Sequence, residues 1–437
     1  MVACGCAPDP APTSLMPQPP AAFAALRHRN FRLLWSGQLV SMAGSMMQNA
    51  AILWQVSLLA APAHRGVALG MVGMVRILPI ITFSIVSGVV ADALDRRRLM
   101  LVTQTGMALS ALALAALEFS GSRLLWPVYV LAAISAAFGT FDGPARQSLT
   151  ATLVPRDELP NAIGLMTTMF QVASVLGPAV GGLVIASAGV AWCYATNAAS
   201  FLCVIVAVLA MRDVPVAAAH ERARVSWAAA REGLAFVFGA PLIRSTMLLD
   251  FFATFFASAT ALLPMVATDL LHVGARGYGL LSAAPSAGAL VAAVALAPMV
   301  PAIRRRGALL LWAVALYGAA TVGFGFARDF TLAFVFLALT GAADTVSMVL
   351  RNIIRQLATP DTMRGRMTSV NMIFFMGGPQ LGELEAGLFA QAFGVVASVV
   401  SGGVGCLLAV GWVAARTPSL RRYVREDAAV TGRDSAA

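Results

Sequence analysis

The sequence predicts an all-α membrane protein whose twelve transmembrane helices form two pseudo-symmetric six-helix bundles. Of its 437 residues, 59% are hydrophobic and 11% are charged, whereas a soluble domain carries about 25% charged residues. So few charges cannot cover a water-facing surface, so lipid must cover much of it. The apolar residues form long runs, and the arginines gather in every second connection between the runs.

Each long apolar run is expected to be a helix, because a helix satisfies its own backbone hydrogen bonds in lipid. The strands of a barrel would be short and would alternate apolar with polar residues. A spanning helix needs about 20 mostly apolar residues. The predicted helices are 32–59, 67–91, 99–119, 125–150, 160–187, 190–211, 243–270, 276–300, 307–327, 330–357, 366–391 and 394–415.

The distribution of basic residues predicts the orientation in the membrane. All 30 are Arg; 25 fall on the side that holds both termini, Arg76 lies within a helix, and four lie in the opposite loops: Arg65, Arg123, Arg276 and Arg328. Basic residues are retained on the cytoplasmic side. Both termini of this multi-pass chain are therefore predicted to be cytoplasmic, and the number of helices is predicted to be even.

The longest connection divides the chain into two halves. Residues 212–242 carry arginines followed by Trp227 and Phe238, a pattern typical of a linker with an amphipathic helix on the membrane surface. The expected domains are a disordered cytoplasmic tail (1–25), a six-helix bundle (26–211), the linker (212–242), a second six-helix bundle (243–415) and a cytoplasmic tail (416–437).

Two landmarks recur between the halves at nearly one offset. Arg96–Arg98 match Arg304–Arg306 after 208 positions, and Arg146 with Pro155 matches Arg351 with Pro360 after 205 positions. This repetition indicates an internal duplication, and duplicated helical halves with a site between them are typical of secondary transporters.

The sequence lacks residues that several classes of protein function require. Without Lys there is no P-loop for ATP hydrolysis. The arginines lie in short clusters between apolar runs, which argues against nucleic acid binding. None of the four histidines lies within an apolar run, so no metal site, cofactor or catalytic residue is predicted. A membrane enzyme, the alternative from another class, would need a catalytic His, Cys or paired carboxylates at the interface.

The connection after the second predicted helix holds Gly88, Asp92 and then Arg96, Arg97 and Arg98. It resembles the signature loop of the major facilitator superfamily, although Ala93 and Asp95 replace the usual Arg and Gly. The resemblance implies the major facilitator fold and a gating role for these five residues. Asp92 can cap a helix N-terminus and pair with the arginines. The alternative is that the arginines only hold the loop inside.

The fifth predicted helix contains Gly177, Pro178, Gly181 and Gly182. This pattern resembles the Gly-Pro-x-x-Gly-Gly signature of proton-coupled exporters in the same superfamily. Physically, it gives the helix a smooth face for close packing. Ordinary small-residue packing is the alternative interpretation.

The C-terminal half also carries a family resemblance. The segment from Gly377 to Gly387, the first-helix start Leu26–Arg32 and Arg76–Pro79 resemble the branch that contains enterobactin exporters and transmembrane secretion effectors. The resemblance covers nearly the whole chain and implies a monomeric carrier of the bacterial inner membrane. It does not identify the cargo.

Ionisable residues inside apolar runs are functional candidates because each costs about 2.5–3.5 kcal/mol to insert at a helix centre. Asp142 and Arg146 are four residues apart and can pair on one helix face. Glu383 and Glu385 point about 200° apart, so at most one faces a central cavity. Low-dielectric surroundings favour a protonated carboxylate, so Glu383 is a candidate proton carrier; a fixed partner of Arg76 is the alternative. The proposed charge relay is Arg76, Asp142, Arg146, Asp344, Glu383 and Glu385.

Polar side chains within the runs are candidates for lining a substrate cavity. Such residues also bond helices to one another, so a structural role stays open for each. The candidates are Gln38, Gln48, Asn49, Gln171, Asp250, Asn371 and Gln380.

Together these features predict a secondary active transporter that exports a small amphipathic or hydrophobic molecule, siderophore- or drug-like. The expected mechanism is alternating access with protons as the coupling ion. Uptake, or facilitated diffusion without proton coupling, is the alternative within transport. The expected partners are the small-molecule substrate, protons and the lipid bilayer.

Overall fold

The computed structural model describes residues 23–212, 227–257, 259–360 and 363–424; within them, some side chains of 84–93, 227–233, 259, 301 and 364–376 are not described. In these ranges the chain forms helices and no strand. Eleven long helices are unbroken: α1 (Arg29–Leu59), α2 (Arg65–Ala93), α3 (Arg96–Phe119), α4 (Leu125–Leu153), α5 (Leu159–Ala188), α6 (Val190–Leu209), α10 (Gly274–Leu296), α11 (Arg306–Phe326), α12 (Phe330–Ala358), α13 (Arg364–Phe393) and α14 (Val395–Arg416).

A twelfth long segment is broken rather than continuous. It consists of α8 (Pro241–Phe256), η3 (Ala259–Leu262), α9 (Leu263–Met265) and the π-helical turn η4 (Val266–Leu270). The prediction of one helix over 243–270 is therefore wrong in detail. Pro264 within this stretch cannot donate the hydrogen bond that a continuous helix needs. The second bundle also begins at Pro241, two residues before the predicted boundary.

Ten of the segments are long and apolar enough to cross a membrane. The other two are α1 and α13, with 31 and 30 residues, which suffices in length. They hold many of the polar candidates, including Gln38, Gln48, Gln380, Glu383 and Glu385. The membrane class is confirmed, and α1 and α13 both carry several of the candidate site residues.

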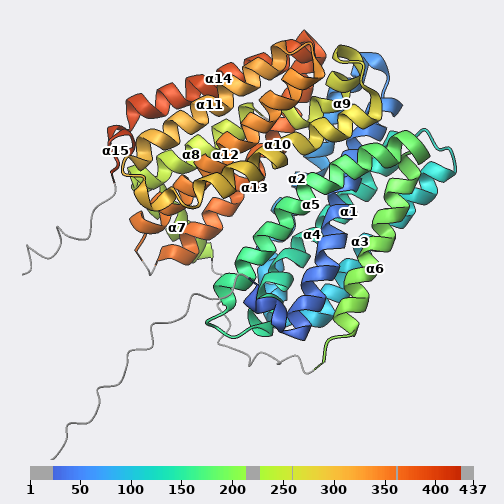
Figure 1. The fold of residues 1–437 in the computed structure, drawn as a ribbon, viewed down its shortest axis with the longest axis horizontal. Coiled ribbons are helices and arrows are strands. Elements are labelled where there is room, and N and C mark those ends of the chain that lie inside the picture. The colour runs from blue at the N-terminus through green and yellow to red at the C-terminus, as the bar shows by residue number, and fades with distance from the viewer. Residues whose placement is uncertain (1–22, 213–226, 258, 361–362, 425–437) are drawn as a thin grey trace, which may run out of the picture.

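The helices pack as two groups, α1–α6 and α8–α14 (Figure 1). The groups meet chiefly where α2 packs on α13 and α5 packs on α10. In a duplicated chain, α2 corresponds to α10 and α5 to α13, so these two contacts are related by the same pseudo-twofold axis.

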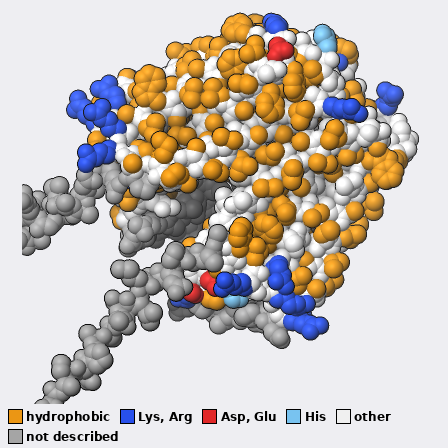
Figure 2. Space-filling view, in the orientation of Figure 1, with side chains coloured by type: hydrophobic (Ala, Val, Ile, Leu, Met, Phe, Trp, Pro, Cys, Tyr) orange, Lys and Arg blue, Asp and Glu red, His pale blue; other side chains and the backbone are white. Residues whose placement is uncertain are grey.

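The connections lie at two ends of the molecule. The arginine-rich end holds Arg96–Arg98, Arg156, Arg304–Arg306 and the short helices α7 (Trp227–Gly239) and α15 (Pro418–Arg421); the arginine-poor end holds η2 (Pro62–His64) and α9. On the face in Figure 2, hydrophobic side chains cover the flanks of both groups and the arginines lie toward the ends. This distribution suits flanks in contact with lipid.

Short helices begin within both predicted tails, in the part of each tail that the structure describes. Ala24–Arg27 form η1, where Ala25 is fully buried and its N–H donates to Asn161 Oδ1 at 3.0 Å. The predicted disordered tail 1–25 is therefore wrong at Ala24 and Ala25, because these small side chains fit against α5. Likewise, Leu420 in the predicted tail 416–437 is buried on α11 and α14.

The linker contains the helix α7, which is the expected position of the amphipathic helix. Val237 is buried against α8 and α13, whereas Arg231, Leu234 and Phe238 are exposed. Residues 213–226, with Arg222 and Arg224, lie outside the described residues.

Candidate functional site

A cavity of about 320 Å³ lies between the two helix groups. We call it the Asp344 cavity. Three of its lining residues lie within two positions of the middle of their helices: Ile80 on α2, Asp344 on α12 and Gln380 on α13. The cavity is therefore close to the midplane, where secondary transporters bind their substrates. Its lining residues are Ile80, Asp250, Thr254, Asp344, Arg351, Phe375, Pro379 and Gln380.

One wall of this cavity is a charged cluster joining α8 and α12. Arg351 Nη1 lies 2.9 Å from Asp250 Oδ1, and Arg351 Nη2 donates to Asp344 Oδ1 at 3.4 Å. The Arg351 and Asp250 side chains are each 2% exposed, whereas the Asp344 side chain is 44% exposed. The buried guanidinium is thus compensated by Asp250, and Asp344 presents its carboxylate to the cavity.

The next turn of α12 extends the cluster toward the arginine-rich end. Arg355 is buried; it donates to Asn352 Oδ1 at 2.5 Å and to Asn371 of α13. Asn371, predicted as a cavity residue, therefore holds an arginine side chain in place.

The first helix group holds a related cluster. Asp142 is buried on α4; Arg146 Nη1 lies 3.7 Å from Asp142 Oδ2, as their spacing predicts. The Asp142 carboxylate also accepts hydrogen bonds from Thr103 Oγ1 at 3.2 Å and Gln104 Nε2 at 2.9 Å of α3. Arg146 in turn donates to Gln38 Oε1 of α1 at 3.2 Å. This cluster satisfies its charges within one helix group.

Arg76 and Glu383 face each other where α2 packs on α13, about one turn nearer the arginine-poor end than the cavity. They interact electrostatically although they form no ion pair within 4.0 Å. Glu383 is 8% exposed, and its Oε2 and Arg76 Nη2 are buried without a hydrogen-bond partner. Glu383 therefore lies in the contact between the helix groups and is absent from the cavity lining.

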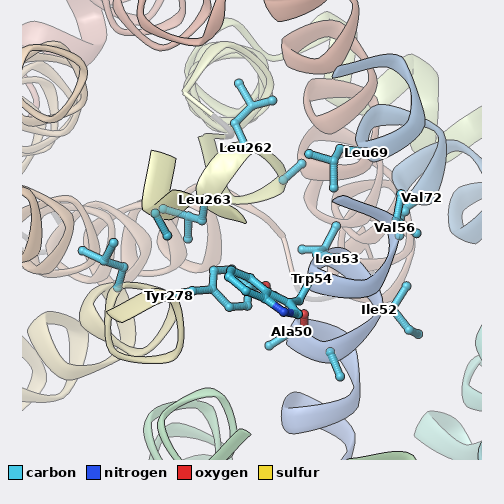
Figure 3. Close-up of a cluster of buried hydrophobic side chains, with 14 of the residues drawn as sticks. Ala50, Ile52, Leu53, Trp54, Val56, Leu69, Val72, Leu262, Leu263 and Tyr278 are labelled. Atoms are coloured by element: carbon cyan, nitrogen blue, oxygen red, sulfur yellow. The ribbon is translucent and has the colours of Figure 1, made fainter. Parts of the chain in front are cut away.

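Between Arg76 and Glu383 and the arginine-poor end of the molecule, hydrophobic side chains from both helix groups pack together and close that end. Figure 3 shows Leu53 and Trp54 of α1 beside Leu262, Leu263 and Tyr278 of the second group. We call this cluster the seal. The Trp54 and Tyr278 rings stack with centroids 5.1 Å apart, and Tyr278 Oη donates to Ala50 O at 2.9 Å.

Close helix contacts and an ion pair reinforce the seal. Gly182 of α5 meets Gly279 of α10 so closely that a Cβ on either would lie 2.6–2.7 Å from the other's Cα. Gly387 of α13 meets Gly70 of α2 similarly. At the rim, Arg65 Nη1 donates to both carboxylate oxygens of Asp269, at 3.0 and 2.9 Å.

The predicted gating residues do not form a loop. Gly88 and Asp92 lie in the last turns of α2, with the Asp92 side chain outside the described residues, and Arg96–Arg98 form the first turn of α3. Asp95 caps α3 by accepting hydrogen bonds from the Arg97 and Arg98 N–H groups. Arg96 donates to Ser148 O at 3.5 Å and Arg97 to Leu209 O at 2.9 Å, both within the first helix group.

The other predicted residues take separate positions. Gln48 accepts a hydrogen bond from Asn197 of α6 at 2.8 Å, Asn49 is exposed, and Gln171 and Glu385 are partly exposed. Gly177 and Gly181 pack on α1, while Gly182 and Pro178 pack on α10. None of these lines the Asp344 cavity.

Sequence reasoning missed several residues of the cavity and the seal. Thr254 and Ile80 have no unusual spacing, and isolated apolar or hydroxyl residues are common in membrane helices. Trp54 and Tyr278 lie near helix ends, where aromatic residues normally mark the membrane interface, so no signal in the sequence separates them from that role.

Comparisons with known proteins agree with this architecture. The family model described as transmembrane secretion effector matches residues 20–431. The multidrug efflux pump Tap of Mycolicibacterium fortuitum is 30% identical over 403 residues, which cover 89% of this chain and 96% of Tap. The enterobactin exporter EntS of Escherichia coli is 24% identical over 409 residues, covering 93% and 96%.

Solved transporter structures share the fold. A bacterial homolog of the human lysosomal transporter Spinster, in an inward-facing and unoccupied conformation, has a TM-score of 0.71 at 15% identity, covering 91% of this chain and 98% of that one. A POT family transporter in complex with a thioalcohol-conjugated peptide has a TM-score of 0.69 at 10% identity, covering 90% and 96%.

Proposed function

We propose that this chain, which belongs to the transmembrane secretion effector family of the major facilitator superfamily, exports a small amphipathic or hydrophobic molecule by alternating access. The chain is a multi-pass membrane transporter and not an enzyme, which removes the membrane-enzyme alternative. The observation that carries the proposal is a mid-helix cavity that touches both helix groups, while the seal closes the arginine-poor end beyond it.

The arginine distribution supports the direction of access. With the arginine-rich end in the cytoplasm of a bacterial inner membrane, the seal faces outward and the Asp344 cavity is loaded from the cytoplasmic side. Export then requires that α2 separate from α13 and α5 from α10. Tap and EntS, to which this chain is similar, are themselves efflux proteins.

The Arg76–Glu383 pair supports coupling to protons. Opening the seal separates this guanidinium and this carboxylate, and separating opposite charges in a low dielectric is costly. Protonating Glu383 removes the attraction, so a proton from outside would favour the open seal. Return to the cytoplasm-facing state releases the proton inward. On this proposal Glu383 carries the proton.

The residues Gly88, Asp92 and Arg96–Arg98 belong to the proposal as the opposite gate. Arg96 and Arg97 hold the ends of α4 and α6 in the present conformation. They are placed at the end where the helix groups would approach each other when the seal opens.

Proton antiport is tested in everted membrane vesicles that report their respiration-driven pH gradient with an acridine dye. Lipophilic cations, catechol siderophores and amphipathic antibiotics are added separately. We expect dequenching with one class, lost in Glu383→Gln and retained in Asp157→Asn, which alters an exposed carboxylate in the α4–α5 connection. Accumulation of a compound without dequenching would refute antiport and favour facilitated diffusion.

A further inference from the structure

The Asp344 cavity offers one accessible charge to a ligand. Of the three charged residues in its lining, Arg351 and Asp250 are each 2% exposed and the Asp344 side chain is 44% exposed. A ligand in the cavity therefore meets a carboxylate oxygen and does not reach the guanidinium.

The arginines are committed to other partners. Arg351 uses its two terminal nitrogens on Asp250 and Asp344. Arg355 lies one turn away, is held by Asn352 and Asn371, and is absent from the cavity lining. An anionic ligand would have to break these buried contacts before it gained a cationic partner, and breaking a buried ion pair is strongly unfavourable.

The remaining walls are mostly apolar and aromatic. Ile80 and Pro379 face the cavity from α2 and α13, and Phe375 is 46% exposed beside them. Polar atoms are limited to Thr254 and Gln380, and Gln380 Oε1 is a buried acceptor without a hydrogen-bond partner. Few directed polar groups among apolar walls are typical of pockets for organic molecules.

We infer that the Asp344 cavity binds an organic cation with aromatic or aliphatic substituents, its positive charge against Asp344 and its apolar groups against Ile80 and Phe375. A bare metal ion would need several oxygen ligands, and the described residues contain no group of three metal-ligating side chains. The cavity volume of about 320 Å³ is at the lower end of the range for small-molecule sites.

This inference names the substrate class for the proposed function, but it is tested by binding alone. The probes are tetraphenylphosphonium and tetraphenylborate, which carry the same four phenyl groups and opposite charges. Their equilibrium binding to the purified full-length protein is measured against empty nanodiscs, for the wild type, Asp344→Asn, Asp344→Glu and Asp157→Asn.

The wild type should bind the phosphonium more tightly than the borate. Asp344→Asn should weaken phosphonium binding roughly tenfold, the equivalent of one lost charge contact of about 1.4 kcal/mol, and leave borate binding no weaker. Asp344→Glu should recover most of the loss, and Asp157→Asn should match the wild type. Equal affinity for both ions, or phosphonium binding unchanged in a folded Asp344→Asn protein, would overturn the inference.

Two safeguards keep the outcomes separate. If Asp344→Asn does not fold, the charge preference of the wild type decides, and tighter borate binding refutes the inference. Asp344-dependent phosphonium binding, with phosphonium accumulation in the vesicles but no dequenching, would refute antiport while leaving the cation site in place. Dequenching by an anionic compound, without phosphonium binding, would refute the cation site and leave proton antiport in place.

Discussion

The contact between Gly182 and Gly279 provides a direct test of the seal. In Gly279→Ala, the new methyl group would lie 2.6 Å from Gly182 Cα and 2.6 Å from Pro178 O. Both neighbours belong to the backbone of α5 and cannot move aside independently, so α5 and α10 must separate at the arginine-poor end. Overpacking of this kind costs about 1–3 kcal/mol, which shifts a two-state population by about 5- to 150-fold.

The shift can be measured by pulsed electron spin resonance between labels at Arg123→Cys and Arg328→Cys in a background without other cysteines. These exposed positions lie at the arginine-poor end of different helix groups. We expect Gly279→Ala to add a longer distance to the distribution. Gly164→Ala is the control, because a Cβ at this position of α5, the helix that Gly279 contacts, meets open space. An unchanged distribution in Gly279→Ala would refute the assignment of this contact to a seal that must open.

Three other variants probe the remaining parts of the mechanism. Glu383→Gln should populate the longer label distance at neutral pH on the order of tenfold more than the wild type, because the attraction between Glu383 and Arg76 is lost. The same pair of labels measures this population. A distance distribution with only the closed state would contradict the coupling role of Glu383. Trp54→Ala removes the stack on Tyr278 and should also open the seal, whereas Trp192→Ala, whose ring contacts Phe119 within the first group, should not. Asp250→Asn leaves Asp344 as the one carboxylate partner of Arg351 among the described residues. The variant should lower the thermal unfolding midpoint in detergent, because removing one partner of a buried ion pair costs about 3–5 kcal/mol. An unchanged midpoint would show that Asp344 compensates the charge of Arg351 by itself.

The order and approximate positions of the long helices could be predicted because lipid imposes a length and an apolar composition on each span. The helix starts could be predicted less well. Arg96 was placed outside the third helix, yet Asp95 caps that helix and brings the arginines into its first turn. The break after Phe256 was missed because the apolar composition continues through Pro264, and hydropathy does not register a change of hydrogen-bond pattern.

The charged residues of the site could be listed from the sequence, because any ionisable residue in an apolar run is unusual. Their arrangement could not, since it depends on which helices touch. Asp250 belongs with Arg351 of α12 only because α8 packs beside α12. Gln380 and Glu383 share a face of α13 and are about one turn apart. Gln380 lines the cavity, whereas Glu383 lies in the contact with α2.

The duplication also bears on why the proposed cation site lies in one half. Arg146 on α4 and Arg351 on α12 occupy matching positions, and each reaches the first helix of its own group, at Gln38 and at Asp250. Asp142 is already bound by Arg146, Thr103 and Gln104. In the second half, Asp250 supplies a carboxylate where the first half has a neutral amide, so Arg351 has two carboxylate partners and Asp344 still keeps 44% of its side chain exposed. The additional carboxylate and the lack of partners like Thr103 and Gln104 on Asp344 among the described contacts together distinguish this cluster from the one around Asp142. On the proposal of this cation site, Gln38 and Asp250 are the pair of positions at which the two related clusters differ in charge.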